Sequence, residues 1–104
     1  MLIEQRTYHL KPGAIHEFLR MYEEEGLKLQ REALGNLIGY FKPDTGDINR
    51  VIQLWGFASN EERLQRRGAL SGNPQWREFL GKAGDMVTEQ HVELLSGAAF
   101  SPIK

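Results

Sequence analysis

Seven segments of the sequence have the hydrophobic patterns of strands and helices, and their order is β-α-β-β-α-β when the last two helical segments are counted as one interrupted helical region. The strand segments are short, rich in β-branched and aromatic residues, and bounded by turn residues. The predicted strands are 2–10, 34–42, 48–57 and 86–95, and the predicted helices are 15–33, 60–70 and 74–83. This order is typical of a ferredoxin-like α+β fold, in which an antiparallel sheet carries all the helices on one face.

The helical segments show an apolar stripe and recognisable start signals. The stripe of the first helix consists of Ile15, Phe18, Leu19, Tyr22, Gly26, Leu29 and Ala33. Because a glycine inside a helix costs about 1 kcal/mol relative to alanine, Gly26 indicates either that this helix packs closely on the sheet, which we favour, or that space is left there for another group. Ser59 and Glu62 form a capping box, and Asn73-Pro74 supplies an N-cap and a first helical residue.

The predicted strands are apolar on both faces, which affects the expected assembly. In strand 48–57, Ile52 and Leu54 oppose Val51, Trp55 and Phe57, and in the last strand Met86, Val92 and Leu94 oppose Val87 and Leu95. A sheet covered on one face only should alternate cleanly between apolar and polar residues. We therefore expect a homodimer through sheet-to-sheet packing, burying about 800 Å² per subunit. The alternative is a monomer in which edge irregularities blur the pattern.

Length and composition limit the classes of protein. The 104 residues suit one domain, 1–104, and 13 basic against 14 acidic side chains argue against partners that are nucleic acids or anionic membranes. No apolar run approaches the roughly 20 residues of a membrane span. The absence of cysteine excludes disulfides and thiolate chemistry. With no secretory signal at the start, a cytoplasmic location is expected.

Several stretches together are similar to one known family. They are Glu4-Gln5-Arg6-Thr7-Tyr8 with Leu10-Lys11-Pro12-Gly13, Leu37-Ile38-Gly39-Tyr40-Phe41, Val51-Ile52-Gln53-Leu54-Trp55-Gly56-Phe57, Asn73-Pro74-Gln75-Trp76 and Ala99-Phe100-Ser101-Pro102. In this order and spacing the chain resembles the NIPSNAP domain over nearly its whole length. The resemblance implies a dimeric α+β barrel with a pocket between sheet and helices. That superfamily includes cofactor-independent monooxygenases and heme-degrading enzymes, but the resemblance transfers no catalytic residue.

Aromatic and polar residues from different segments make the candidate site. A cleft lined by aromatic rings with a few polar groups suits a small aromatic ligand. The candidate ligand-binding residues are Arg6, Tyr8, Tyr40, Gln53, Trp55, Trp76 and His91. The competing interpretation is that the aromatic rings belong to the core and satisfy their polar atoms locally.

The arginines near this site need partners or contact with solvent. Arg6 lies in the middle of the first strand and needs a partner there, either a carboxylate such as Glu89 or an anionic ligand. We expect Arg63, Arg66 and Arg67 to form a solvated helix face.

Catalytic and cofactor motifs are missing from the sequence. No metal-ligand spacing, nucleophile elbow or phosphate loop occurs, so we expect no metal and no cofactor. Heme-degrading relatives use a histidine from the second helical region, which has none here, and this leaves His91 as the remaining heme ligand candidate. Two functions stay open: a small-molecule-binding or interaction module, and a cofactor-independent monooxygenase-like enzyme acting on a small aromatic substrate.

Overall fold

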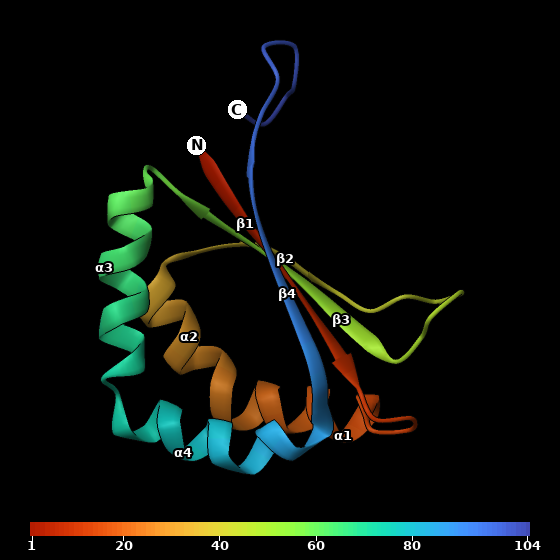
Figure 1. The fold of residues 1–104 in the computed structure, drawn as a ribbon. Coiled ribbons are helices and arrows are strands. Elements are labelled where there is room, and N and C mark those ends of the chain that lie inside the picture. Colours follow the sequence, from red (N-terminus) through yellow and green to blue (C-terminus); the bar gives the residue numbers. More distant parts are fainter.

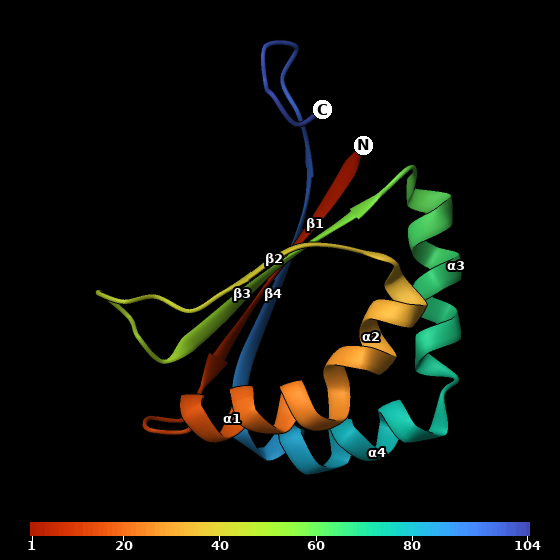
Figure 2. The ribbon, with the colours of Figure 1, turned by 180° about the vertical axis from the view of Figure 1, so that it is seen from behind.

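A computed structural model describes all residues from 1 to 104 and shows an antiparallel sheet with its helices gathered on one side (Figures 1 and 2). The elements are β1 (Leu2–Leu10), α1 (Ile15–Met21), the π-helical turn η1 (Tyr22–Gly26), α2 (Leu27–Leu34), β2 (Asn36–Phe41), β3 (Arg50–Phe57), α3 (Asn60–Ser71), α4 (Pro74–Ala83), the short 3-10 turn η2 (Gly84–Met86) and β4 (Val87–Ser96). None of the helices has the length and apolar character needed to cross a membrane.

The sheet has the strand order β2-β3-β1-β4, and every neighbouring pair is antiparallel. With the helices on one face, this order confirms the ferredoxin-like prediction. β1 is central, so its side chains meet residues of two strands. Arg6, for example, lies opposite Gln53 of β3 on one side and Val92 of β4 on the other.

Both faces of β3 carry apolar side chains, as the sequence predicted for that strand. Val51, Trp55 and Phe57 are buried on the helix-covered face, whereas Ile52 and Leu54 point to the uncovered face and are half-buried. In β4 the predicted grouping of Val87 with Leu95 is wrong. A register shift between His9 and Leu10 places Val87 opposite Leu10, on the helix-covered side.

The first helical segment bends where the sequence predicted one continuous helix. A π-helical turn separates α1 from α2, and the two run in different directions (Figure 2). Gly26 ends this turn, and a Cβ there would lie 3.0 Å from ring atoms of Phe79 and Tyr22. The close approach predicted from this glycine is therefore made to α4 and not to the sheet.

The start signals of α3 and α4 are both present, but Glu62 bonds the residue before the cap and not the cap residue itself. The Ser59 hydroxyl accepts a hydrogen bond from the Glu62 N–H, and the Glu62 carboxylate accepts from the N–H of Ala58, one residue before the cap. The Asn73 side chain accepts from the N–H groups of Gln75 and Trp76. These bonds fix the start of α4, which carries Trp76 and Phe79 to the sheet.

The face of the sheet without helices is apolar over β2, β3 and part of β1. Phe41 is 51% exposed there, and Leu95 of β4 is 37% exposed. The Phe41 ring lies across Gly39, where an added Cβ would come within 2.4 Å of it. Only a glycine at this position lets the ring lie flat on the sheet. This part of the uncovered face therefore presents apolar side chains that no helix covers.

Candidate functional site

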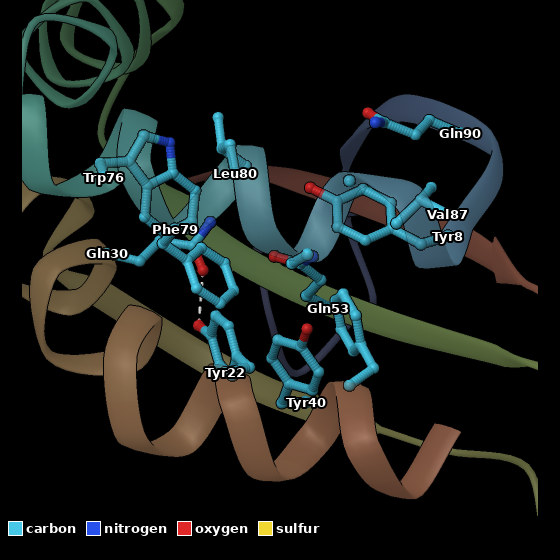
Figure 3. Close-up of a pocket in the computed structure, with 13 residues that line it drawn as sticks. Tyr8, Tyr22, Gln30, Tyr40, Gln53, Trp76, Phe79, Leu80, Val87 and Gln90 are labelled. Carbon is cyan, nitrogen blue, oxygen red and sulfur yellow. Dashed lines mark hydrogen bonds between the residues drawn. The ribbon is translucent and has the colours of Figure 1, made fainter. Parts of the chain in front are cut away.

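A cavity of about 50 Å³ lies between the sheet and the helices (Figure 3). Most of its lining is aromatic or aliphatic, and the lining residues are Tyr8, Phe18, Tyr22, Gln30, Tyr40, Gln53, Trp76, Phe79, Leu80, Ala83, Gly84, Val87 and Gln90. Leu80 and Gln90 are exposed, so the cavity reaches the surface between α4 and β4. The position agrees with the pocket that the family resemblance implies.

Tyr22 and Tyr40 form a stacked pair on one wall, with ring centroids 4.7 Å apart. The Tyr22 hydroxyl donates a hydrogen bond to Oε1 of buried Gln30 at 2.5 Å (Figure 3). Burial, followed by the neighbouring tyrosines, raises the pKa of Tyr22 and of Tyr40 well above the ordinary value. Both side chains are therefore neutral hydroxyls at physiological pH.

Gln53 is fully buried at the centre of the sheet, and its orientation is fixed by Trp55. The indole N–H of Trp55 donates to Gln53 Oε1 at 2.7 Å. Because an indole can only donate, the amide oxygen faces Trp55 and the amide nitrogen faces away from it. Gln53 Nε2 and the Tyr40 hydroxyl are both buried and have no hydrogen-bond partner in the protein. They belong to cross-strand partners, and in Figure 3 the hydroxyl points toward Gln53.

The structure brings together some of the seven candidate residues and separates others. Tyr8, Tyr40, Gln53 and Trp76 line the cavity. Trp55 lies outside the lining, and its hydrogen bond to Gln53 orients the amide that lines the cavity.

Arg6 stands next to the cavity, and His91 stands apart from it. The Arg6 Nε–H donates to the Tyr8 hydroxyl at 3.3 Å. His91 does not lie near the aromatic group, because it is opposite Thr7 on the uncovered face of the sheet. No histidine lines the cavity.

The partner of Arg6 differs from the expected one. Glu89 is opposite His9, on the other face from Arg6, and Arg6 instead contacts Glu4 at 3.5 Å, two residues away on the same face. Glu4 is fully buried and also accepts hydrogen bonds from Arg63 and Arg67 of α3. The prediction of a solvated face is therefore wrong for these two arginines, which point inward and cover the carboxylate.

Arg66 takes a different position on α3 and is more exposed. Its side chain bonds Glu62 of the same helix and the carbonyl of Ala33 at the end of α2. Arg66 therefore ties two helices together at the surface.

The cluster of Glu4 with three arginines is charged and tightly packed. Burial raises the pKa of Glu4, but the hydrogen bonds and charges of Arg67, Arg63 and Arg6 outweigh it, so that the pKa lies below its ordinary value. For Arg67, burial and repulsion by Arg6 outweigh the attraction of Glu4 and lower its pKa. The lowered pKa favours the charged form of Glu4 and disfavours the charged form of Arg67, because three cations share one anion. All three guanidiniums still carry their charge.

Several residues of the site gave little signal in the sequence. Tyr22 and Phe79 looked like ordinary members of apolar stripes, and Gln30 looked like a surface residue of a helix. Glu4 was detectable, because it lies two residues from Arg6 and side chains two apart share one face of a strand. The periodicity of β1 would have favoured Glu4 over Glu89, the partner that the sequence analysis named for Arg6.

The chemistry available in the cavity is that of neutral hydrogen-bonding groups on an aromatic wall. The polar lining consists of three tyrosines, three glutamines and a tryptophan, with no carboxylate, imidazole or amine. Such a site can hold and orient a ligand ring by stacking and hydrogen bonds. It lacks a side chain that would take up a proton near neutral pH.

The fold and the position of the cavity place this chain among the ferredoxin-like α+β proteins. A solved structure of an antibiotic biosynthesis monooxygenase superposes with a TM-score of 0.66 over 94% of this chain and 99% of that chain. Its sequence identity is 16%, so this likeness shows the fold alone.

The family model for NIPSNAP matches residues 3–102, and the chain belongs to the NIPSNAP family. The human protein NipSnap homolog 3A is 33% identical over 93 residues, which are 88% of this chain and 37% of that protein. The solved structure of Atu4242 from Agrobacterium tumefaciens has 39% identity and a TM-score of 0.96 over 100% of both chains. Atu4242 is a NIPSNAP family protein with unknown function. The chain thus spans well under half of its human relative.

Proposed function

We propose that this chain binds a small aromatic molecule in the cavity between sheet and helices. The observation that carries the proposal is the pair of buried donors, Gln53 Nε2 and the Tyr40 hydroxyl, which have no partner in the protein. A buried polar group without a partner costs about 1–3 kcal/mol. Since Trp55 occupies the amide oxygen, the ligand would present a hydrogen-bond acceptor to Gln53. A quinone, quinol or phenol oxygen has this character.

The size of the cavity limits the proposed ligand. About 50 Å³ is small beside the roughly 300–1,000 Å³ of sites for drug-sized ligands. The proposed ligand therefore inserts a single ring or smaller group, and any remainder passes out between Leu80 and Gln90. The rings of Tyr8, Tyr22 and Phe79 would contact the inserted group.

Binding is favoured here over catalysis. A cofactor-independent monooxygenase acting on a quinol needs a group that removes the substrate proton, and no lining residue is a base near neutral pH. The likeness to a monooxygenase structure extends only to the fold. The enzyme alternative predicts oxygen uptake with a bound quinol, and the binding proposal predicts none.

Titration of tryptophan fluorescence with phenol, hydroquinone and 1,4-naphthoquinone tests the proposal. We expect saturable binding of at least one compound, and about tenfold weaker binding to Gln53→Leu, a loss of one hydrogen bond worth about 1.4 kcal/mol. Tyr40→Phe should weaken binding similarly. Gln65→Leu, on the exposed face of α3, is the matched control and should bind like the unmodified chain. Equal affinities of all four proteins would refute the assignment of the donors.

We also propose that two copies pack through the uncovered face of the sheet. The support is its exposed apolar side chains, Phe41 and Leu95, and the half-buried Ile52 and Leu54 beside them. Light scattering should give twice the chain mass of 11.9 kDa. Leu54→Asp should shift the mass to that of one chain, whereas Leu64→Asp on the outer face of α3 should not. A monomer at every concentration of the unmodified chain would contradict the proposed interface.

A further inference from the structure

Three potential metal ligands meet on the uncovered face of the sheet. His9 lies near the end of β1, and Glu89 is its direct partner on β4. His91 is two residues further along β4, so it projects from the same face as Glu89. Direct and diagonal cross-strand neighbours on one face are within reach of long side chains. The pairing of β1 with β4 thereby joins two histidines that are far apart in the sequence.

The distances between these side chains suit a common ion. Glu89 Oε2 lies 2.9 Å from His91 Nε2 and 3.7 Å from His9 Nε2, and the ligand atoms of all three residues lie within 4.8 Å of one another. Two metal bonds of about 2.1 Å at a tetrahedral angle separate their ligand atoms by roughly 3.4 Å. The two observed distances lie on either side of this value. Small rotations of exposed side chains are enough to reach it.

A second carboxylate orients one of the imidazoles. Asp47, in the loop between β2 and β3, places Oδ2 at 3.5 Å from His9 Nδ1. Its other oxygen accepts the N–H of Asn49 at 3.2 Å, which holds the carboxylate in place. A carboxylate on the distal nitrogen of a histidine fixes the ring and directs the other nitrogen to the metal. Nε2 of His9 is the nitrogen that faces Glu89.

The arginine that faces His9 across the strands forms no ion pair with the three ligands. Arg50 is the partner of His9 on β3, and its Nε donates to the carbonyl oxygen of Asp47 at 3.2 Å. It makes no ion pair with Glu89 or with the side chain of Asp47. In a single chain the side chains of His9, Glu89 and His91 are 30%, 59% and 57% exposed, so an ion from solution can reach them before two copies pack together.

We propose that His9, Glu89 and His91 bind a divalent transition-metal ion through two imidazole nitrogens and one carboxylate oxygen. Imidazole ligands favour Zn²⁺, Ni²⁺ and Cu²⁺ over Mg²⁺ and Ca²⁺. Three protein ligands leave a coordination position for water or for an external group. The sequence hid this site because its residues share no spacing motif, and the expectation of no metal rested on that absence. The site lies across the sheet from the aromatic cavity and does not depend on the ligand proposed for it.

Isothermal titration of the tag-free chain with ZnCl2, after treatment with a chelator, tests the site. We expect one ion per chain, and at least a tenfold loss of affinity for His9→Ala, His91→Ala and Glu89→Gln. His16→Ala is the matched control, because His16 is on α1 and belongs to no ligand cluster. Circular dichroism should show that all variants keep the fold, as these side chains lie on the surface.

Two further measurements identify the ligands. Zinc X-ray absorption should show two imidazoles in the first coordination shell, and Asp47→Asn should lower the affinity about tenfold through the orientation of His9. Absence of binding at millimolar ZnCl2 would overturn the proposal. So would variants of His9 and His91 that bind as tightly as the His16→Ala control.

Discussion

Glu4→Gln tests how far the buried charge cluster stabilises the fold. Glu4 is fully buried, and its carboxylate accepts hydrogen bonds from Arg6, Arg63 and Arg67. An amide has one oxygen, and its nitrogen would present donors to a cluster that already consists of donors. The variant thus leaves at least one guanidinium without a partner and leaves all three positive charges uncompensated.

The expected loss can be worked from the burial of the cluster. Removing one partner of a buried ion pair costs about 3–5 kcal/mol. The side chains of Arg6, Arg63 and Arg67 retain 17%, 17% and 19% exposure, so water compensates part of the loss. We therefore expect the lower end, about 3 kcal/mol at pH 7, and a melting temperature lower by about 12 °C.

Urea denaturation at a fixed protein concentration measures this loss, because any assembly makes stability depend on concentration. Glu93→Gln is the matched control, since Glu93 is exposed on β4 and makes no ion pair; its change should stay within about 0.5 kcal/mol. A loss below that value for Glu4→Gln would refute the account of the cluster.

The same variant makes a pH prediction. The pKa of Glu4 is lower in the folded chain than its ordinary value of 4.5. A carboxylate with a lowered pKa stabilises the fold fully above the ordinary value, and this stabilisation is lost as pH falls through the folded value. The difference between the unmodified chain and Glu4→Gln should therefore shrink below about pH 4.5 and stay constant above it. A difference that grows as pH falls would contradict this sign.

Three smaller changes test other parts of the packing by the same denaturation assay. Asn73→Ala removes an acceptor for two N–H groups at the start of α4 and should cost about 1 kcal/mol. Gly26→Ala adds a Cβ at 3.0 Å from the buried rings of Phe79 and Tyr22. The overpacking should outweigh the gain in helix propensity and lower the free energy of unfolding by about 1 kcal/mol. A higher free energy of unfolding would show that the rings move aside at little cost. Tyr40→Phe removes a buried hydroxyl without a protein partner, so stability in the absence of ligand should not fall, and a loss above about 1 kcal/mol would show that the hydroxyl is satisfied.

The fold was predictable because the local start and turn signals agree with the order of strands and helices along the chain. The capping box at Ser59 and the Asn73-Pro74 step set the helix starts, and the turn residues set the strands. What the sequence could not show was local irregularity. The register shift beside His9 reversed the face of Val87, and the π turn before Gly26 redirected a helix that looked continuous.

The candidate site was partly predictable: the sequence indicates which residues share a face of the sheet, but not which helix residues contact them. Tyr8, Tyr40 and Gln53 share one face because strand periodicity and the strand order place them there. The contacts of Tyr22 with Gln30 and of Glu4 with Arg67 join residues through helix rotation and helix-to-sheet packing, which no strand pattern encodes. The His9 and His91 pair depends on the register between the first and last strands.

The alternation along β1 separates two sets of properties on one strand. Glu4, Arg6 and Tyr8 face the helices, where they form the charged cluster and one wall of the cavity. Ile3 and His9 face the other way, toward the surface proposed for assembly and metal binding. The polar groups on the two faces do not touch. Changes at Glu4, Arg6 or Tyr8 should therefore alter stability and ligand binding, while changes at Ile3 or His9 should alter the mass of the assembly in solution and the affinity for metal. A one-residue slip of this strand would exchange the two sets, and the buried carboxylate of Glu4 with its arginine partners opposes such a slip.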